Sequence, residues 1–128
     1  MARIVTDVGA SIIAQRIKGL ETEPLYIAWG TGTTVPVAGD IALKTEDASY
    51  GYSRVAGVSV IVTLGANLDT YQVSGSITAT ANLTISEWGL FDALTVGNML
   101  LREVTATPFI LSIGQTINFV FKVQIARC

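Results

Sequence analysis

Apolar and polar residues alternate along several short segments in the second half of the chain. Residues 71–78, 83–86 and 117–125 follow this pattern. Successive side chains of a strand point to opposite faces, so the alternation predicts strands with one buried face. In the last segment the predicted buried face comprises Ile117, Phe119, Phe121, Val123 and Ile125. Turn residues at 65–69, near Asn82, at 96–98 and at 112–115 separate these segments. Their spacing indicates an antiparallel β-sandwich or barrel, and local periodicity leaves both open.

Three further segments are predicted as strands on other grounds. Residues 25–29 form a short apolar run that ends in a Gly-Thr-Gly loop. In residues 58–62 three valines alternate with Ser59 and Ile61, which predicts a strand covered on both faces. Residues 99–104 form another apolar run, which we expect to end by Pro108.

The N-terminal part of the chain has a helical rather than a strand period. Apolar residues recur at helical spacing, which predicts one amphipathic helix over residues 8–18, with Asp7 as its N-cap. Residues 1–7 are a candidate N-terminal arm that becomes ordered on a neighbouring molecule. Asp40 is a candidate cap for a short helical turn over residues 41–46 with Leu43 facing inward. Residues 47–53 read as a loop or an edge strand, and residues 1–128 as a single domain.

The composition changes this picture from a generic β-domain to one that assembles. Half of the residues are hydrophobic and 14% are charged, against the usual share of about a quarter. We therefore expect neighbouring molecules to cover part of the surface. The net charge is −2 and no basic stripe occurs, so a nucleic-acid partner is not expected. No signal peptide or apolar run long enough to span a membrane is expected either. The single cysteine allows no disulfide within the chain, which fits synthesis in a reducing cytosol.

Several catalytic classes are excluded by residue type. The chain has no histidine, which removes Ser-His-Asp and Cys-His machinery and the commonest zinc and copper sites. The adjacent pair Glu46 and Asp47 is interpreted as solvated loop charges rather than a catalytic dyad, and with Asp40 it matches no calcium-loop pattern. The loop 30–32 lacks the Gly-Lys-Ser/Thr ending of a phosphate cradle, so a strand exit with positive-φ glycines is the favoured interpretation. We predict no enzyme activity, no metal and no cofactor.

Some residues are candidates for contacts between subunits. Glu87 lies between apolar neighbours, which indicates a buried hydrogen bond or a subunit contact, while an edge-exposed position fits the alternation equally well. Aromatic residues at strand ends are assigned to core or interface ahead of sugar stacking. Cys128, the only cysteine, is a bystander, a reactive thiol or an interchain disulfide partner. The candidate subunit-interface residues are Arg3, Ile4, Tyr50, Tyr52, Glu87 and Trp88.

Residues 85–93, Ile-Ser-Glu-Trp-Gly-Leu-Phe-Asp-Ala, resemble a motif I-x-E-x-G-L-F-D-A. That motif recurs in small β-rich structural proteins of tailed bacteriophages. Residues 5–9, 26–32, 98–102 and 114–124 are also similar to this family, so the resemblance spans nearly the whole chain. From the residues themselves, Gly89 suits a bend or bulge and Asp92 an Asx-type turn.

The resemblance implies a virion structural protein without catalytic residues. The first hypothesis is a capsid decoration (cement) protein on the outer surface of the phage head, which binds and stabilises the major capsid protein lattice as a homotrimer. Because related motifs occur in tail-fibre and collar proteins, the alternative is a tail component. That component would be a collar-fibre or baseplate-attached module of a receptor-binding assembly. A sugar-binding module on the virion surface is a third hypothesis.

Overall fold

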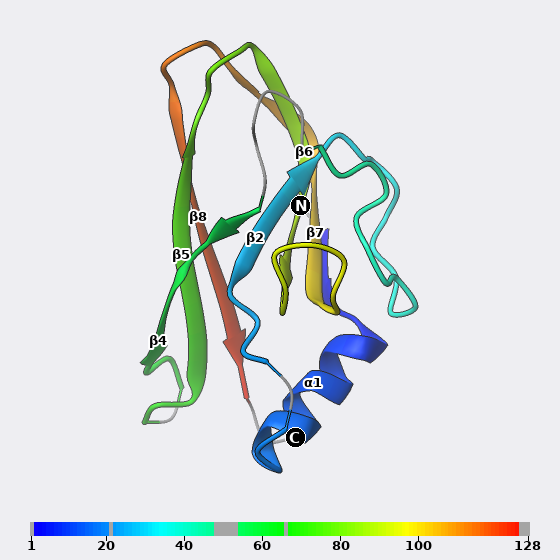
Figure 1. The fold of residues 1–128 in the computed structure, drawn as a ribbon, viewed down its shortest axis with the longest axis vertical. Helices are drawn as coiled ribbons and strands as arrows, with labels where there is room; N and C mark the ends of the chain where they lie inside the picture. Colours follow the sequence, from blue (N-terminus) through cyan, green and yellow to red (C-terminus); the bar gives the residue numbers. More distant parts are fainter. Residues whose placement is uncertain (1, 21, 48–53, 66, 126–128) are drawn as a thin grey trace.

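The computed structural model describes residues 2–20, 22–47, 54–65 and 67–125. In this part of the chain eight strands and one helix are present (Figure 1). Their bounds, in chain order, are β1 Ala2–Val5, α1 Asp7–Ile17, β2 Tyr26–Gly30, β3 Val55–Ala56, β4 Val58–Val62, β5 Thr70–Thr78, β6 Leu83–Phe91, β7 Met99–Leu111 and β8 Thr116–Gln124.

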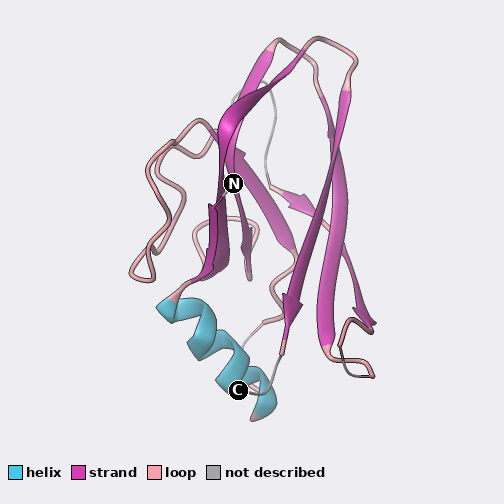
Figure 2. Ribbon diagram, turned by 180° about the vertical axis from the view of Figure 1, so that it is seen from behind, coloured by secondary structure: helices cyan, strands magenta, loops and turns pink. Residues whose placement is uncertain are grey.

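The strands form two antiparallel sheets that face each other (Figure 2). The five-stranded sheet has the order β1-β7-β6-β2-β3, and the three-stranded sheet has the order β4-β5-β8. Neither sheet closes on itself. The prediction of a mainly β, antiparallel fold with one N-terminal helix is therefore confirmed, and the arrangement is sandwich-like rather than a barrel.

Apolar side chains from both sheets fill the space between them. In β8, Phe119, Phe121 and Val123 are buried, while Val120 points outward, as the alternation predicts. Ile125 follows the end of β8 and is exposed, so it departs from the predicted buried face. The central core comprises Ile12, Ile27, Trp29, Val73, Ile77, Ile85, Leu90, Phe119 and Phe121, among others.

Strand β7 passes through Pro108, where the sequence predicted an end. In the ladder with β6, Ile85 pairs with Phe109 and Glu87 pairs with Val104. Residues 105–108 therefore lie in a bulge opposite Ser86. A proline there removes no ladder hydrogen bond, because the paired register is already interrupted.

Strand β4 differs from its predicted environment. It is an edge strand that pairs with β5, and Val58 and Ile61 are 68% and 54% exposed. The expectation that both faces are covered is therefore wrong. Alternation of apolar residues on both faces is compatible with a central strand or with an edge whose cover lies outside the chain.

Helix α1 lies within one residue of its predicted bounds, but its cap is different. Thr6, rather than Asp7, is the N-cap: its Oγ1 accepts the Gly9 N–H at 2.9 Å and donates to the Met99 carbonyl at 2.6 Å. Ala2–Val5, predicted as part of an arm on a neighbouring molecule, instead forms β1 on the edge of its own chain's sheet, paired with β7.

Two loop predictions also change. Residues 41–46 contain no helical turn, although Leu43 is buried as expected, in a small second core with Ala28, Phe91 and Met99. Asp92 accepts the Asn98 N–H at 2.7 Å across a wider turn than the predicted Asx-type turn. Residues 48–53, with Tyr50 and Tyr52, and Cys128 lie outside the described residues.

Candidate assembly surfaces and the buried charge cluster

A cluster of buried charges joins the long loop after β2 to the five-stranded sheet. Glu87 on β6, Arg102 on β7 and Asp40 in the loop have side chains that are 0%, 0% and 1% exposed. Arg102 Nη2 lies 2.9 Å from Glu87 Oε2, and its Nη1 lies 3.2 Å from Asp40 Oδ2. Arg102 pairs with Gly89 in the ladder, so it is a diagonal neighbour of Glu87 on the same face.

Glu87 also holds the loop backbone. Its carboxylate accepts the N–H groups of Gly32 at 3.2 Å, Lys44 at 3.0 Å and Thr45 at 2.7 Å. Of the alternatives left open by the sequence, the buried hydrogen bond is correct and the edge-exposed position is wrong. Since Glu87 has no exposed surface in this chain, its role is internal rather than that of a contact surface.

The backbone of the Gly-Thr-Gly loop, residues 30–32, passes close to the Glu87 carboxylate, and only glycine leaves room for this approach. A Cβ on Gly32 would lie 2.5 Å from Glu87 Oε1, and one on Gly30 would collide with the Thr45 carbonyl oxygen. Neither glycine is among the described residues with positive φ, so the predicted reason for these glycines is wrong. The loop surrounds an anion, but that anion is a side chain of its own protein.

Asp40 completes the cluster and is ionised within it. Its carboxylate accepts the Val37 N–H at 3.1 Å and lies 2.7 Å from Lys44 Nζ. Burial by itself raises the pKa of Asp40. The Lys44 and Val37 hydrogen bonds and the charges of Lys44 and Arg102 outweigh that effect and lower the pKa below its ordinary value. Each charge has an internal partner, so the cluster is structural.

The remaining acidic candidates do not form a shared site. Glu46 makes a two-point ion pair with Arg54, with both N···O distances 2.9 Å, and the Arg54 guanidinium lies 3.6 Å from the Phe91 ring centroid. The solvated-charge interpretation of Glu46 is therefore replaced by an ion pair. Among the described residues, no group of three or more potential metal-ligating His, Cys, Asp or Glu side chains occurs.

The loop held by this cluster presents aliphatic side chains to solvent. Val35 and Ile41 are 73% and 71% exposed, and Val37 is also exposed. The loop projects beside the five-stranded sheet, as the cyan segment in Figure 1. We define Val35, Val37 and Ile41 as the loop patch. These three exposed side chains, on a loop whose backbone is fixed from inside the chain, make the loop a candidate contact surface.

Trp88 lies on the opposite face of β6 from Glu87, since the two residues are consecutive in the strand. Its ring is nearly buried and packs against Phe109 and Phe119 at centroid distances of 5.8 and 5.9 Å. Its Nε1 donates to Glu103 Oε2 at 3.2 Å. A surface cavity of about 530 Å³ adjoins it, and Phe109 and Val120 are exposed beside that cavity.

The predicted interface residues occupy different environments. Arg3 is on the edge strand β1 with a side chain 66% exposed, and its Nε lies 4.0 Å from Glu103 Oε1. Glu103 therefore links Arg3 to Trp88. Ile4 is half-buried on the same edge strand. The sequence missed Arg102 and the loop patch. The signal for Arg102 was a charged residue inside an apolar run, together with Glu87, an acidic residue among apolar neighbours directly after the predicted strand 83–86.

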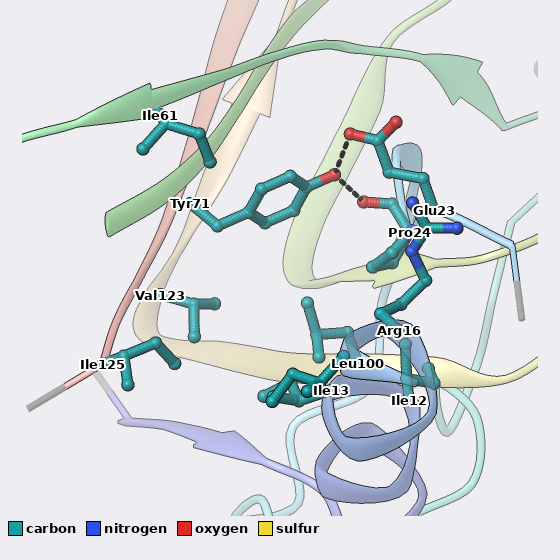
Figure 3. A pocket seen from close by; sticks show the side chains of 11 residues that line it. Ile12, Ile13, Arg16, Glu23, Pro24, Ile61, Tyr71, Leu100, Val123 and Ile125 are labelled. Atoms are coloured by element: carbon teal, nitrogen blue, oxygen red, sulfur yellow. Dashed lines mark hydrogen bonds between the residues drawn. The ribbon is translucent and has the colours of Figure 1, made fainter. Parts of the chain in front are cut away.

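A further apolar cavity of about 480 Å³ lies between α1 and the three-stranded sheet (Figure 3). Ile13 from the helix and Ile61, Val123 and Ile125 from the sheet side line it. Tyr71 Oη lies 2.7 Å from the Pro24 carbonyl oxygen and 3.0 Å from Glu23 Oε1. Burial and the Glu23 contact raise the Tyr71 pKa, so the phenol stays protonated and serves as a packing group.

Comparisons with known proteins add no family to these observations. Neither a scan against protein-family models nor a search of curated proteins finds a match. In the described residues, no helix combines the length and apolar character needed to cross a membrane. The chain is thus defined by its sandwich-like fold, its internally paired charges and its exposed aliphatic patches.

Proposed function

We propose that this protein is a structural component of a tailed-bacteriophage particle, and specifically a capsid decoration protein. In this role it sits on the outer surface of the head, binds the major capsid protein and stabilises the lattice as a homotrimer. The observation that carries the proposal is the distribution of its surface: buried charges are paired inside the chain, while aliphatic side chains project from loops and strand edges.

The surface distribution supports assembly because exposed aliphatic groups on a small monomer are a liability unless a partner covers them. Contacts repeated over a shell add interface area, and stable protein interfaces each bury on the order of 1,000 Å² or more. The resemblance of residues 85–93 to phage structural proteins supports the virion as the place of assembly. The loop patch is the surface that we assign to the major capsid protein, since the charge cluster fixes its shape.

The test is binding to separated phage parts. Purified protein is mixed with DNA-filled heads lacking it, and separately with tails, and bound protein is measured by cosedimentation. We expect saturable binding to heads, at a multiple of three copies per site, and loss of that binding in the triple variant Val35→Ser/Val37→Ser/Ile41→Ser. Ile17→Ser, at a residue more exposed than any in the loop patch but on α1, is the matched control and should bind normally.

Two outcomes would overturn the placement on the head. Saturable binding to tails, without binding to heads, would support the alternative of a collar-fibre or baseplate module, which rests on the motifs shared with tail-fibre and collar proteins. Binding to neither part would contradict a virion role. Equal loss of binding in the Ile17→Ser control would show that the loop patch is not the specific contact.

A further inference from the structure

Strand β4 has a free backbone edge. It is the outermost strand of the three-stranded sheet, and within the described residues it pairs with β5 alone. A strand of five residues presents a row of unsatisfied N–H and C=O groups over about 17 Å on such an edge. Both alternating faces of β4 carry exposed aliphatic side chains, with Val58 and Val60 on one and Ile61 on the other.

The other sheet edges carry charges and β4 does not. Edge strands β1 and β8 contain Arg3 and Lys122, and β3 is two residues long and directly follows Arg54. Residues 55–68 contain no charged side chain. Charged side chains and short length are the usual protection against edge-to-edge pairing. An edge without either protection is the one at which a further strand can add to the sheet.

We propose that a second copy of this chain covers β4 by antiparallel strand pairing across a two-fold axis centred on Val60. In this register Val58 lies opposite Val62 of the other copy, and Val60 lies opposite its own counterpart. A two-fold axis perpendicular to the sheet keeps each face continuous, so the two three-stranded sheets become one six-stranded sheet. The register fills one face with cross-strand pairs of β-branched residues, which stabilise antiparallel pairs.

The absence of charge favours a second copy as the partner. In a two-fold contact centred on Val60, that residue meets its own counterpart and the other β4 residues meet residues of the same strand, so a charge at the axis would face a like charge. The uncharged, β-branched edge of β4 avoids this repulsion. A foreign partner would have to supply an exposed strand of its own, whereas a second copy brings one. This contact goes beyond the proposed function and is separate from the trimer, so the free protein is sufficient to test it.

Cross-linking tests the register. In a Cys128→Ser background, Val60→Cys is treated with a short bis-maleimide at tens of micromolar protein. Residues directly opposite in an antiparallel pair have Cβ atoms about 5 Å apart, so we expect a covalent dimer as the main product. Val120→Cys in the same background is the matched control. It is on edge strand β8 and slightly more exposed, 56% against 44%, and should remain mostly monomeric.

A charge at the axis tests the energetics. Val60→Lys would place two ammonium groups opposite each other, and we expect a dissociation constant for the dimer at least about tenfold higher by sedimentation equilibrium. Val120→Lys should leave it unchanged. Circular dichroism of the two variants is the check that both fold. Equal cross-linking at the two positions, or identical sedimentation of wild type and Val60→Lys, would overturn the proposal.

Discussion

Two regions of the molecule differ in which residues they bury. The face of the five-stranded sheet under the loop buries charged residues, whereas the free edge of the three-stranded sheet exposes aliphatic ones. Charged side chains are rarely fully buried, yet Glu87 and Arg102 have no exposed surface beneath the loop. Aliphatic residues are usually inside, yet β4 exposes Val58 and Ile61. The first region is completed by its own chain. In the second region, β4 pairs with only one strand among the described residues. Residues of the first region therefore specify the fold, and those of the second are available for assembly.

The buried cluster is not a simple ion pair that apolar residues could replace. Replacing buried ion pairs by well-packed apolar residues is often neutral, because desolvation offsets the Coulomb attraction. Here the Glu87 carboxylate also accepts three backbone N–H groups of the loop. An apolar residue at position 87 would leave those donors buried and unsatisfied. We infer that the cluster fixes the loop conformation rather than simply adding stability.

The largest expected effect comes from Arg102→Met. It removes the cation that faces Glu87 and Asp40 and leaves both carboxylates buried, which should lower the free energy of unfolding by about 3–5 kcal/mol. Urea denaturation measures this change. The matched control on the other region is Val58→Ser on the exposed edge, where we expect a change of less than about 0.5 kcal/mol at protein concentrations that keep the chain monomeric. Similar decreases in the free energy of unfolding of the two variants would contradict the view that the buried cluster, and not the β4 edge, specifies the fold.

An intermediate effect is expected for Gly32→Ala. The added methyl would lie 2.5 Å from Glu87 Oε1, and neither the carboxylate nor the loop backbone can move without breaking hydrogen bonds. Such overpacking typically costs about 1–3 kcal/mol. Gly39→Ala is the control in the same loop, because its methyl would meet no atom within 4 Å. Differential scanning calorimetry should show a lower Tm for Gly32→Ala alone; equal shifts would argue against the close-approach explanation.

The strand pattern of the sheets could be predicted from the sequence because period-two alternation reports a buried face directly. In β8, Phe119, Phe121 and Val123 gave the correct face without knowledge of their partners. The helix was also predictable, since Ile12 and its apolar neighbours follow a 3.6-residue period. Its cap was not, because Thr6 and Asp7 are both acceptable caps and the choice depends on the distant Met99 carbonyl.

The charge cluster could not be predicted as a unit because its central contacts, those of Arg102 with Glu87 and Asp40, are long-range. Asp40, Glu87 and Arg102 are far apart in sequence and come together only through the β6–β7 ladder and the path of the loop. Local pattern left Glu87 between a buried and an exposed position. The exposure of β4 was unpredictable for a related reason: alternation indicates which faces are apolar, but not whether another strand covers them.

The smallest of the three effects is a change in pH dependence at Asp40. Its pKa is lowered in the folded protein from the ordinary value of 3.8, so the unfolded state binds more protons in acid. The stability that ionised Asp40 contributes is fully present above its unfolded pKa and is lost as the pH falls through its folded pKa. Urea midpoints measured from about pH 7 to about pH 2.5 should therefore fall more steeply below pH ~4 for wild type than for Asp40→Asn. At protein concentrations that keep the chain monomeric, Val58→Ser, on the uncharged edge, should follow the wild-type curve. Parallel curves for wild type and Asp40→Asn would show that Asp40 gains nothing from its ionised partners, and the loop would then be held by Glu87 and Arg102 alone.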